Sequence, residues 1–599
     1  MGVTATLSRD QLRLLDHSNV TLRLKISLIV GYSFLAFNGF TLTLYPLERY
    51  TPSFYTHLPP YYWILSIAIF MGCAYLLLRY LDMKALYKSL LVLLITLNNF
   101  LLLFSPFICG VFLMSGGDSP TYAGMAQDIV QYQDVNFQTI FYPSIPIFIG
   151  LLSTVSKITY LGSVIILAPL FSLLFPICMY ILSKIILDNP MANKLSFLSG
   201  STLFLSGVFP VNSTTTVFGL SLLTLPILLI SIIMKEQNEG IPYTIMVLIF
   251  IFSYVMYHPL TGFLIFFSII ILFFMRLNFK QKINYGLYAI FPTAFAGYIF
   301  LITTVWKRPM GFIRDFLESF MDYSEKEGYR VDVGQNLEHL GFDLYDTISL
   351  AIKMFGHQAL LLLFISIFAF FILVRYTKKF TAKDYWIQLI YCWVFVSVGL
   401  LTLQIVKPLF VISFYRFLYC AILFAPLVSA IVITDLIKVS HKMVGVLLIL
   451  CFLFTCGVFT MYPSPYISQA NPQVTFSDSA GALWIIENKN ADSPVIGYFG
   501  SGITKRISSG LLPYRDYLEL KKNYGAIGDH LDYSSRLAAD NLDLNTNILV
   551  VLTDYDLIVY SGVYHNIGRL NINDVEKFNS DPIVSCIYNN GGYTLYEIP

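Results

Sequence analysis

The sequence predicts an α-helical polytopic membrane protein that ends in a small α/β domain. Of its 599 residues, 56% are hydrophobic and 12% are charged, against roughly 25% charged residues in an ordinary soluble domain. Apolar stretches near the length of about 20 residues that crosses a bilayer recur along most of the chain. The formal net charge of +2 is too small to attract the phosphates of a nucleic acid, so nucleic acid is not a natural partner.

The apolar stretches predict about 13 transmembrane helices. They lie at 24–46, 61–81, 89–114, 159–186, 195–211, 214–234, 243–258, 260–276, 284–306, 346–375, 385–406, 412–438 and 442–462. The first two precede the rest as an N-terminal segment, 1–88, and the others form a transmembrane core, 89–462.

One further apolar run, 142–158 ("YPSIPIFIGLLSTVSKI"), is short and interrupted by proline. If this run does not cross the membrane, the Lys and Arg clusters between the spans fall on one side, which the positive-inside rule makes the cytoplasm. We therefore interpret 142–158 as an interfacial or re-entrant helix. This topology predicts a plasma-membrane protein with a cytoplasmic N-terminus, outer loops at 115–158 and 307–345, and an extracytoplasmic region 463–599.

From about Pro463 the composition becomes that of a soluble domain. "SDSAGALWIIENKN" has helical periodicity after a Ser/Asp cap, and "SPVIGYFG" and "NILVVLTD" are typical of short strands. "PIVSCIYNNGGYTLYEI" predicts a hairpin with Asn-Gly at its turn. The region 463–599 contains no glycine-rich nucleotide-binding motif and no nucleophile elbow.

Asp118, in "GGDSPTYAGMAQDI", is the first charged residue after a long apolar run. One interpretation is an N-cap carboxylate, which accepts the free N–H groups of a helix's first turn and tolerates Pro120 there. The other is a carboxylate that faces a cleft at the outer membrane surface and deprotonates an incoming nucleophile.

The whole arrangement resembles the GT-C superfamily of membrane glycosyltransferases, which includes protein O-mannosyltransferases, aminoarabinose transferases and oligosaccharyltransferase catalytic subunits. The resemblance covers about 89–599 and is strongest in "GGDSPTYAGMAQDI", "YHPLTGF" and "CIYNNGGYTLYEI". It implies that Asp118 is the catalytic carboxylate and that the donor is a sugar on a polyprenyl phosphate or diphosphate. The acceptor would be an extracytoplasmic glycan, lipid or protein of the cell envelope.

Two departures from the family pattern limit the chemistry. Where oligosaccharyltransferases carry WWDYG, this chain reads "GYFGSGITKR", which argues against glycosylation of asparagine sequons. "GGDSP" contains one acidic residue without a nearby DxD, and the cysteines have no metal-ligand spacing, so the sequence does not support a requirement for a divalent metal and indicates no other cofactor.

Two cations are candidates for binding the donor phosphate, whose departing charge a fixed cation stabilises. Arg416, in "VISFYRFLYC", lies about one turn inside the outer end of a span, and Lys407 lies closer to the surface. For both residues the alternative is a side chain that reaches the lipid headgroups, and for Lys407 that alternative is favoured.

The candidate substrate-binding residues are His258, Asp128, Glu318 and Tyr142. His258 is equally typical of a structural residue at a helix break, and Asp128 and Glu318 of solvated surface. Two rival functions remain open. A transporter or flippase of lipid-linked sugars would show internal repeats and mid-membrane charges, and a noncatalytic scaffold would use Asp118 only as a cap.

Overall fold

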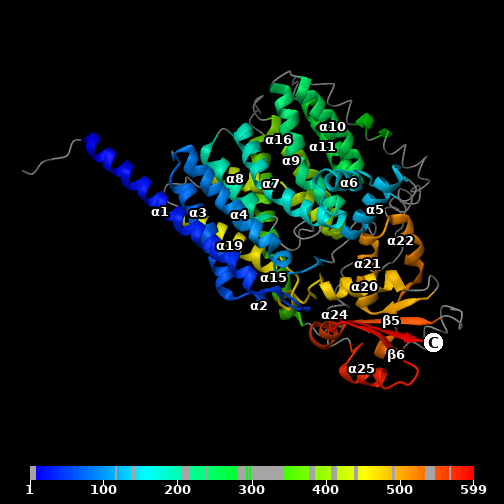
Figure 1. Cartoon of the computed structure of the whole chain (residues 1–599). Coiled ribbons are helices and arrows are strands. Elements are labelled where there is room, and N and C mark those ends of the chain that lie inside the picture. The colour runs from blue at the N-terminus through cyan, green and yellow to red at the C-terminus, as the bar shows by residue number, and fades with distance from the viewer. Residues whose placement is uncertain are drawn as a thin grey trace, which may run out of the picture.

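The computed structural model of the chain is mostly helical, with a five-stranded sheet near the C-terminus (Figure 1). It describes residues 9–81, 83–114, 118–136, 140, 142–187, 189–203, 205, 216–237, 241–278, 292–294, 296–297, 343–376, 385–406, 414–436, 443–488, 493–532, 547–564 and 568–599.

The N-terminal helices form a packed group. These are α1 (Arg9–Leu44), the short α2 (Phe54–His57), α3 (Pro60–Arg79) and α4 (Ala85–Ile108). Buried amides link them, since Asn38 Nδ2 donates to Ser66 Oγ (3.0 Å) and Asn98 Nδ2 donates to the Ser66 carbonyl (3.1 Å). Such links between apolar helices hold neighbours in register.

Among the described residues, ten further helices build the core of the apolar region. They are α7 (Tyr160–Leu187), α8 (Pro190–Leu203), α9 (Val217–Gln237), α10 (Ile241–Tyr257), α11 (Pro259–Asn278), α15 (Leu344–Tyr376), α16 (Tyr385–Val406), α17 (Phe414–Ile422), α18 (Ala425–Leu436) and α19 (Met443–Thr460). α8 packs between α7 and α18, and its residues from Ala192 onward are buried.

Within the described residues, eight helices are long and apolar enough to cross a membrane, or nine if α17 and α18, bent by 43°, form one span. The chain is therefore a multi-pass membrane protein, but about 13 spans are not confirmed. Of the expected span 195–211, the structure describes the part in α8, up to Leu203, while residues 204 and 206–211 lie outside the described residues. Those at 243–258 and 260–276 correspond to shorter apolar helices, and 284–306 lies largely outside the described residues.

The run 142–158 forms α6 (Ser144–Ser156), a helix of 13 residues. At 1.5 Å per residue it is about 20 Å long, less than the roughly 30 Å of a bilayer's hydrocarbon core. Its length therefore agrees with a helix that does not cross. It packs beside α5 (Ser119–Tyr132), which follows the two-residue strand β1 (Leu113–Met114).

The C-terminal region, residues 463–599, contains a five-stranded sheet in the order β4-β3-β5-β7-β6. The strands are β3 (Val495–Gly497), β4 (Tyr524–Ala526), β5 (Ile548–Thr553), β6 (Ser585–Asn589) and β7 (Tyr593–Ile598). β3 runs parallel to β4 and β5, whereas β7 is antiparallel to β5 and β6. β5 is buried along its whole length, which explains why "ILVVL" is continuously apolar.

The principal helices of the C-terminal region are α20 (Phe476–Asn488), α21 (Phe499–Leu511), α22 (Tyr514–Leu520), α24 (Asp554–Ile558) and α25 (Ile572–Asn579). α20 packs on one face of the sheet through Ile485, and α25 packs on the other through Phe578. Both expected strands, the helix and the hairpin with Asn590-Gly591 at its turn are confirmed. The cap of α20 differs from the expected Ser/Asp, because Thr475 Oγ1 accepts from the Asp478 N–H (3.2 Å).

The orientation of the chain stays a prediction, and Cys586 allows a direct test. This cysteine is exposed in the C-terminal region, while the other described cysteines are buried or partly buried. A membrane-impermeant maleimide added to intact cells should label Cys586 and a cysteine introduced at Ser115. A cysteine at Lys379 should react only after permeabilisation, and its labelling in intact cells would contradict the topology.

Candidate functional site

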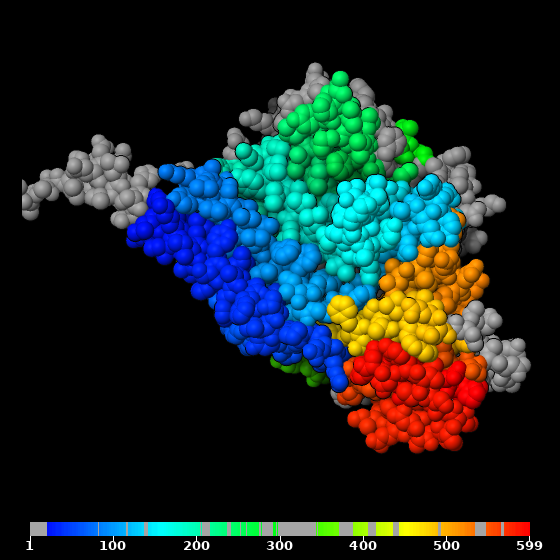
Figure 2. Space-filling view, in the orientation of Figure 1, coloured from blue at the N-terminus to red at the C-terminus, as the bar shows by residue number. Residues whose placement is uncertain are grey.

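The C-terminal region lies directly against β1 and α5, residues 113–132 (Figures 1 and 2). β1 pairs antiparallel with β2 (Gln473–Val474), with Leu113 opposite Val474. α5 packs on α21, and α22 lies beside it. Asp118, at the start of α5, is therefore flanked by contacts with a region that lies more than 350 residues away in the sequence.

The side chain of Asp118 is exposed and makes no capping hydrogen bond to α5. Its backbone has ψ of 12°, whereas a capping residue usually has an extended backbone that directs its oxygen to the N–H groups of the first turn. Pro120, in that turn, also lacks an N–H. The interpretation of Asp118 as a side-chain cap is therefore wrong, and only its carbonyl joins the helix, by accepting from the Tyr122 N–H (3.1 Å).

Four of the residues singled out from the sequence converge at one place. The charges of Asp118 and Arg416 both act on Tyr142 and on Tyr122. The Tyr142 ring stacks on His258 with ring centres 5.6 Å apart. These side chains come from the residues just before α5 and α6, the junction between α10 and α11, and the start of α17.

Phe218, at the start of α9, lies beside both His258 and Arg416. Its ring centre lies 5.2 Å from that of His258 and 5.9 Å from the guanidinium carbon of Arg416. His258 is buried, and its Nδ1 accepts from the Leu260 N–H (3.2 Å). A neutral imidazole with that contact carries its proton on Nε2.

The two phenols of this cluster remain protonated. Burial raises the pKa of Tyr122, and the negative charge of Asp118 raises it further, while Arg416 opposes both effects. Burial also raises the pKa of Tyr142, with Arg416 lowering it and Asp118 raising it. Within the described residues, Asp118 and Arg416 form no ion pair. The site thus offers a carboxylate, a guanidinium and two neutral hydroxyl groups to a ligand.

The remaining sequence candidates have other surroundings. Asp128, interpreted as solvated surface, is fully buried and paired with Arg515 of α22, with Nε 3.2 Å from Oδ2. A neighbour that is remote in sequence thus replaces water around this carboxylate. Lys407 and Glu318 lie outside the described residues. The roles of all these residues in binding or catalysis stay predictions.

The structure adds residues that were not singled out from the sequence. Tyr122 lies one helical turn after Asp118, so helical spacing within the quoted stretch could have revealed it. Burial raises the pKa of Tyr517, on α22, to about 12. The negative charge of Asp118 also raises this pKa, and the positive charge of Arg506 lowers it. Nothing in the local sequence around Tyr517 indicates this proximity. No group of three or more potential metal ligands occurs among the described residues.

No protein-family model matches the chain, and no curated protein matches it. Among solved structures, it is similar to the apo oligosaccharyltransferase of Archaeoglobus fulgidus, with 11% identity, a TM-score of 0.49 and coverage of 86% of this chain and 75% of that one. The same organism's AglB oligosaccharyltransferase, in complex with an inhibitory peptide and a dolichol-phosphate, has 11% identity, a TM-score of 0.48 and coverage of 80% and 71%. ArnT from Cupriavidus metallidurans, bound to undecaprenyl phosphate, has 11% identity, a TM-score of 0.39 and coverage of 86% and 98%.

At 11% identity and with TM-scores below 0.5, this likeness supports no conclusion about the fold or the activity of this chain. It assigns no role to any residue of this chain, so the function has to be argued from the residues of the site.

Proposed function

We propose that the chain is a membrane glycosyltransferase that moves a sugar from a polyprenyl-phosphate-linked donor to an extracytoplasmic acceptor. The observation that carries the proposal is the meeting of Asp118, Tyr142, His258 and Arg416 beside the C-terminal region. A carboxylate and a guanidinium whose charges act on the same two tyrosines, without pairing with each other, suit a reaction in which a proton leaves one substrate and a phosphate leaves the other.

In the proposed reaction, Asp118 accepts the proton of an acceptor hydroxyl as its oxygen attacks the anomeric carbon of the donor. A new bond forms between that oxygen and the anomeric carbon. The bond between the anomeric carbon and the phosphate oxygen breaks, and its electron pair stays on the phosphate. Arg416 balances the charge that develops there, and the protonated Tyr122 and Tyr142 supply hydrogen-bond donors.

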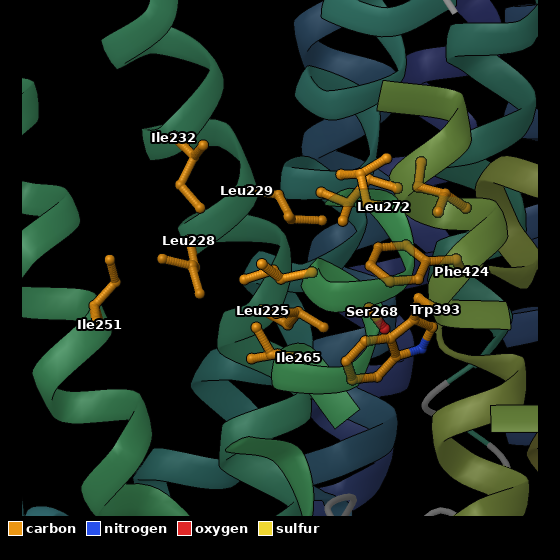
Figure 3. Close-up of a pocket in the computed structure, with 13 residues that line it drawn as sticks. Leu225, Leu228, Leu229, Ile232, Ile251, Ile265, Ser268, Leu272, Trp393 and Phe424 are labelled. Carbon is orange, nitrogen blue, oxygen red and sulfur yellow. The ribbon is translucent and has the colours of Figure 1, made fainter. Parts of the chain in front are cut away.

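An apolar cavity between the core helices could take a short segment of a donor's hydrocarbon chain (Figure 3). Its volume is about 40 Å³, well below the roughly 300–1,000 Å³ of pockets that enclose a whole ligand, so the rest of the chain would lie outside it. The lining residues come from α9, α10, α11, α16 and the bend between α17 and α18: Leu225, Leu228, Leu229, Ile232, Ile251, Ile265, Ser268, Ile269, Leu272, Leu389, Ile390, Trp393 and Phe424.

The cavity and the polar cluster share three structural elements. Phe218 and Leu225 both lie on α9, and His258 precedes α11, which carries Ile265. Arg416 lies on α17, and Phe424 follows at its end. Along α9 and at the start of α11, seven residues separate the two positions, about 10 Å at 1.5 Å per residue. A phosphate at Arg416 would therefore leave its polyprenyl chain within reach of the cavity.

The direct test incubates the purified protein in lipid nanodiscs with polyprenyl-phosphate-linked sugars and cell-envelope acceptors. We expect the sugar to appear on an acceptor and free polyprenyl phosphate to be released in equal amount. Movement of the lipid-linked sugar across a vesicle membrane without transfer would contradict the proposal and favour a flippase.

Filling the cavity should weaken donor use. Leu229 lines the cavity and is buried, so Leu229→Trp should raise the KM for the polyprenyl donor about tenfold. Ile245 on α10 is 51% exposed, and Ile245→Trp is the matched control, with an unchanged KM. Equal KM values in both variants would exclude this cavity as the chain-binding site.

A further inference from the structure

The contacts of α5 with the C-terminal region extend along nearly the whole helix. At its start, the Thr121 hydroxyl donates to Ser509 Oγ of α21 (3.2 Å). At Gly124, an added Cβ would collide with the backbone carbonyl of Ser509 and would lie 2.7 Å from that of Leu512. The α5 backbone therefore touches the C-terminal turn of α21, an approach that only glycine permits.

At the other end of α5, Arg515 binds Asp128 through two groups. Its Nε lies 3.2 Å from Oδ2, and its backbone N–H donates to Oδ1 (3.4 Å). The guanidinium also lies over the Tyr132 ring, 4.4 Å from the ring centre. Because Asp128 is fully buried, losing Arg515 would leave its carboxylate without this charged partner.

A second contact holds the chain on the other side of Asp118. The Phe112 N–H donates to the Val474 carbonyl (3.0 Å) in the β1–β2 pair. Asp118 follows β1 by four positions in the sequence and immediately precedes α5. Since its own side chain makes no hydrogen bond within the described residues, the position of its carboxylate depends on how these two flanking contacts hold the backbone.

We propose that Arg515 is a positioning residue of the transferase and that the α5–α21–α22 contact completes the catalytic site by holding Asp118. The expected effect on kcat rests on the proposed function, whereas the expected effect on the stability of the α5 contact does not. Ten residues separate Asp128 from Asp118, which corresponds to about 15 Å along the axis of α5. The backbone hydrogen bonds of a helix make its two ends move together. A small tilt at the Arg515 end therefore displaces the carboxylate at the other end.

Releasing this contact should lower kcat without changing donor binding. A displacement of about 1 Å at a reacting group can cost about 10²-fold in rate, so we expect Arg515→Ala to lower kcat by about 10- to 100-fold. The affinity for polyprenyl phosphate, titrated separately, should stay unchanged because Arg416 lies on α17. Arg515→Lys should retain part of the rate that Arg515→Ala loses. The double variant with Asp128→Arg and Arg515→Asp should have a higher kcat than either of these two single variants.

Gly124→Ala provides an independent route to the same effect, because its methyl group would separate α5 from α21. Gly502→Ala is the matched control, since Gly502 lies on α21 with no atom within 4 Å of an added Cβ. Amide hydrogen exchange over 119–132 should accelerate in Arg515→Ala and Gly124→Ala and stay unchanged in Gly502→Ala.

Two kinetic outcomes would overturn the inference. One is an unchanged kcat in both Arg515→Ala and Gly124→Ala, and the other is a parallel loss of donor affinity, which would indicate general unfolding. If the unaltered protein transfers no sugar, the proposed function fails. Hydrogen exchange then tests by itself whether Arg515 holds α5 against the C-terminal region. Unchanged exchange over 119–132 in Arg515→Ala would then reject Arg515 as the residue that holds α5.

Discussion

Asp118→Asn should lower the rate of sugar transfer by about 10²- to 10⁴-fold, the usual cost of losing a general base, while expression and donor binding stay normal. An amide oxygen cannot take up the acceptor's proton, whereas the size and shape of the side chain are kept. Folding should be unaffected because the Asp118 side chain makes no capping hydrogen bond to α5. A loss of activity with normal stability would therefore reflect chemistry.

The measurement is the turnover of purified variants in nanodiscs at saturating donor. Asp516→Asn is the matched control, because Asp516 is an exposed aspartate on α22, and it should leave turnover unchanged. Full transfer by Asp118→Asn would remove Asp118 from the mechanism. The base would then have to be sought among the acidic residues of 307–345.

Arg416→Ala should lower turnover by about 10²- to 10³-fold, the magnitude found when one stabilising donor to a developing anion is removed. Arg416 is exposed and forms no ion pair within the described residues, so its guanidinium can meet a phosphate with both nitrogens. Arg416→Lys should recover only part of the loss because an ammonium cannot present the same fork.

A side chain that only anchors in the lipid headgroups would behave differently. Arg79, at the last turn of α3, is an exposed arginine at a span end, and Arg79→Ala should leave donor kinetics unchanged. If Arg416→Ala and Arg416→Lys have the same kinetics as Arg79→Ala, Arg416 belongs to the anchoring class and the donor phosphate binds elsewhere.

Much of the fold could be predicted where local pattern determines structure. The strands β3 and β5 and the β6–β7 hairpin follow from apolar runs and an Asn-Gly pair, since period and turn chemistry act over a few residues. The span count was harder to predict. Hydropathy cannot distinguish a lipid-facing helix from a buried one such as α8, which packs against α7 and α18.

The candidate site divides in the same way. The sequence pointed to Asp118, Tyr142, His258 and Arg416 because each is a polar residue at the edge of an apolar run, and the structure brings these four together. The same reasoning interpreted Asp128 as solvated. It could not reveal Arg515 or Tyr517, because no local pattern marks a residue whose partner lies hundreds of positions away.

The sequence by itself determined that this protein is a multi-pass membrane protein with an α/β region at its C-terminus, because composition and periodicity decide which segments leave water. Only the tertiary structure decided that the Asp118 carboxylate does not cap its helix, that Asp128 is buried against Arg515, and that Gly124 lets α5 touch α21. Burial and charge pairing depend on the distance between side chains in space, and the fold sets that distance by packing the C-terminal region against β1 and α5.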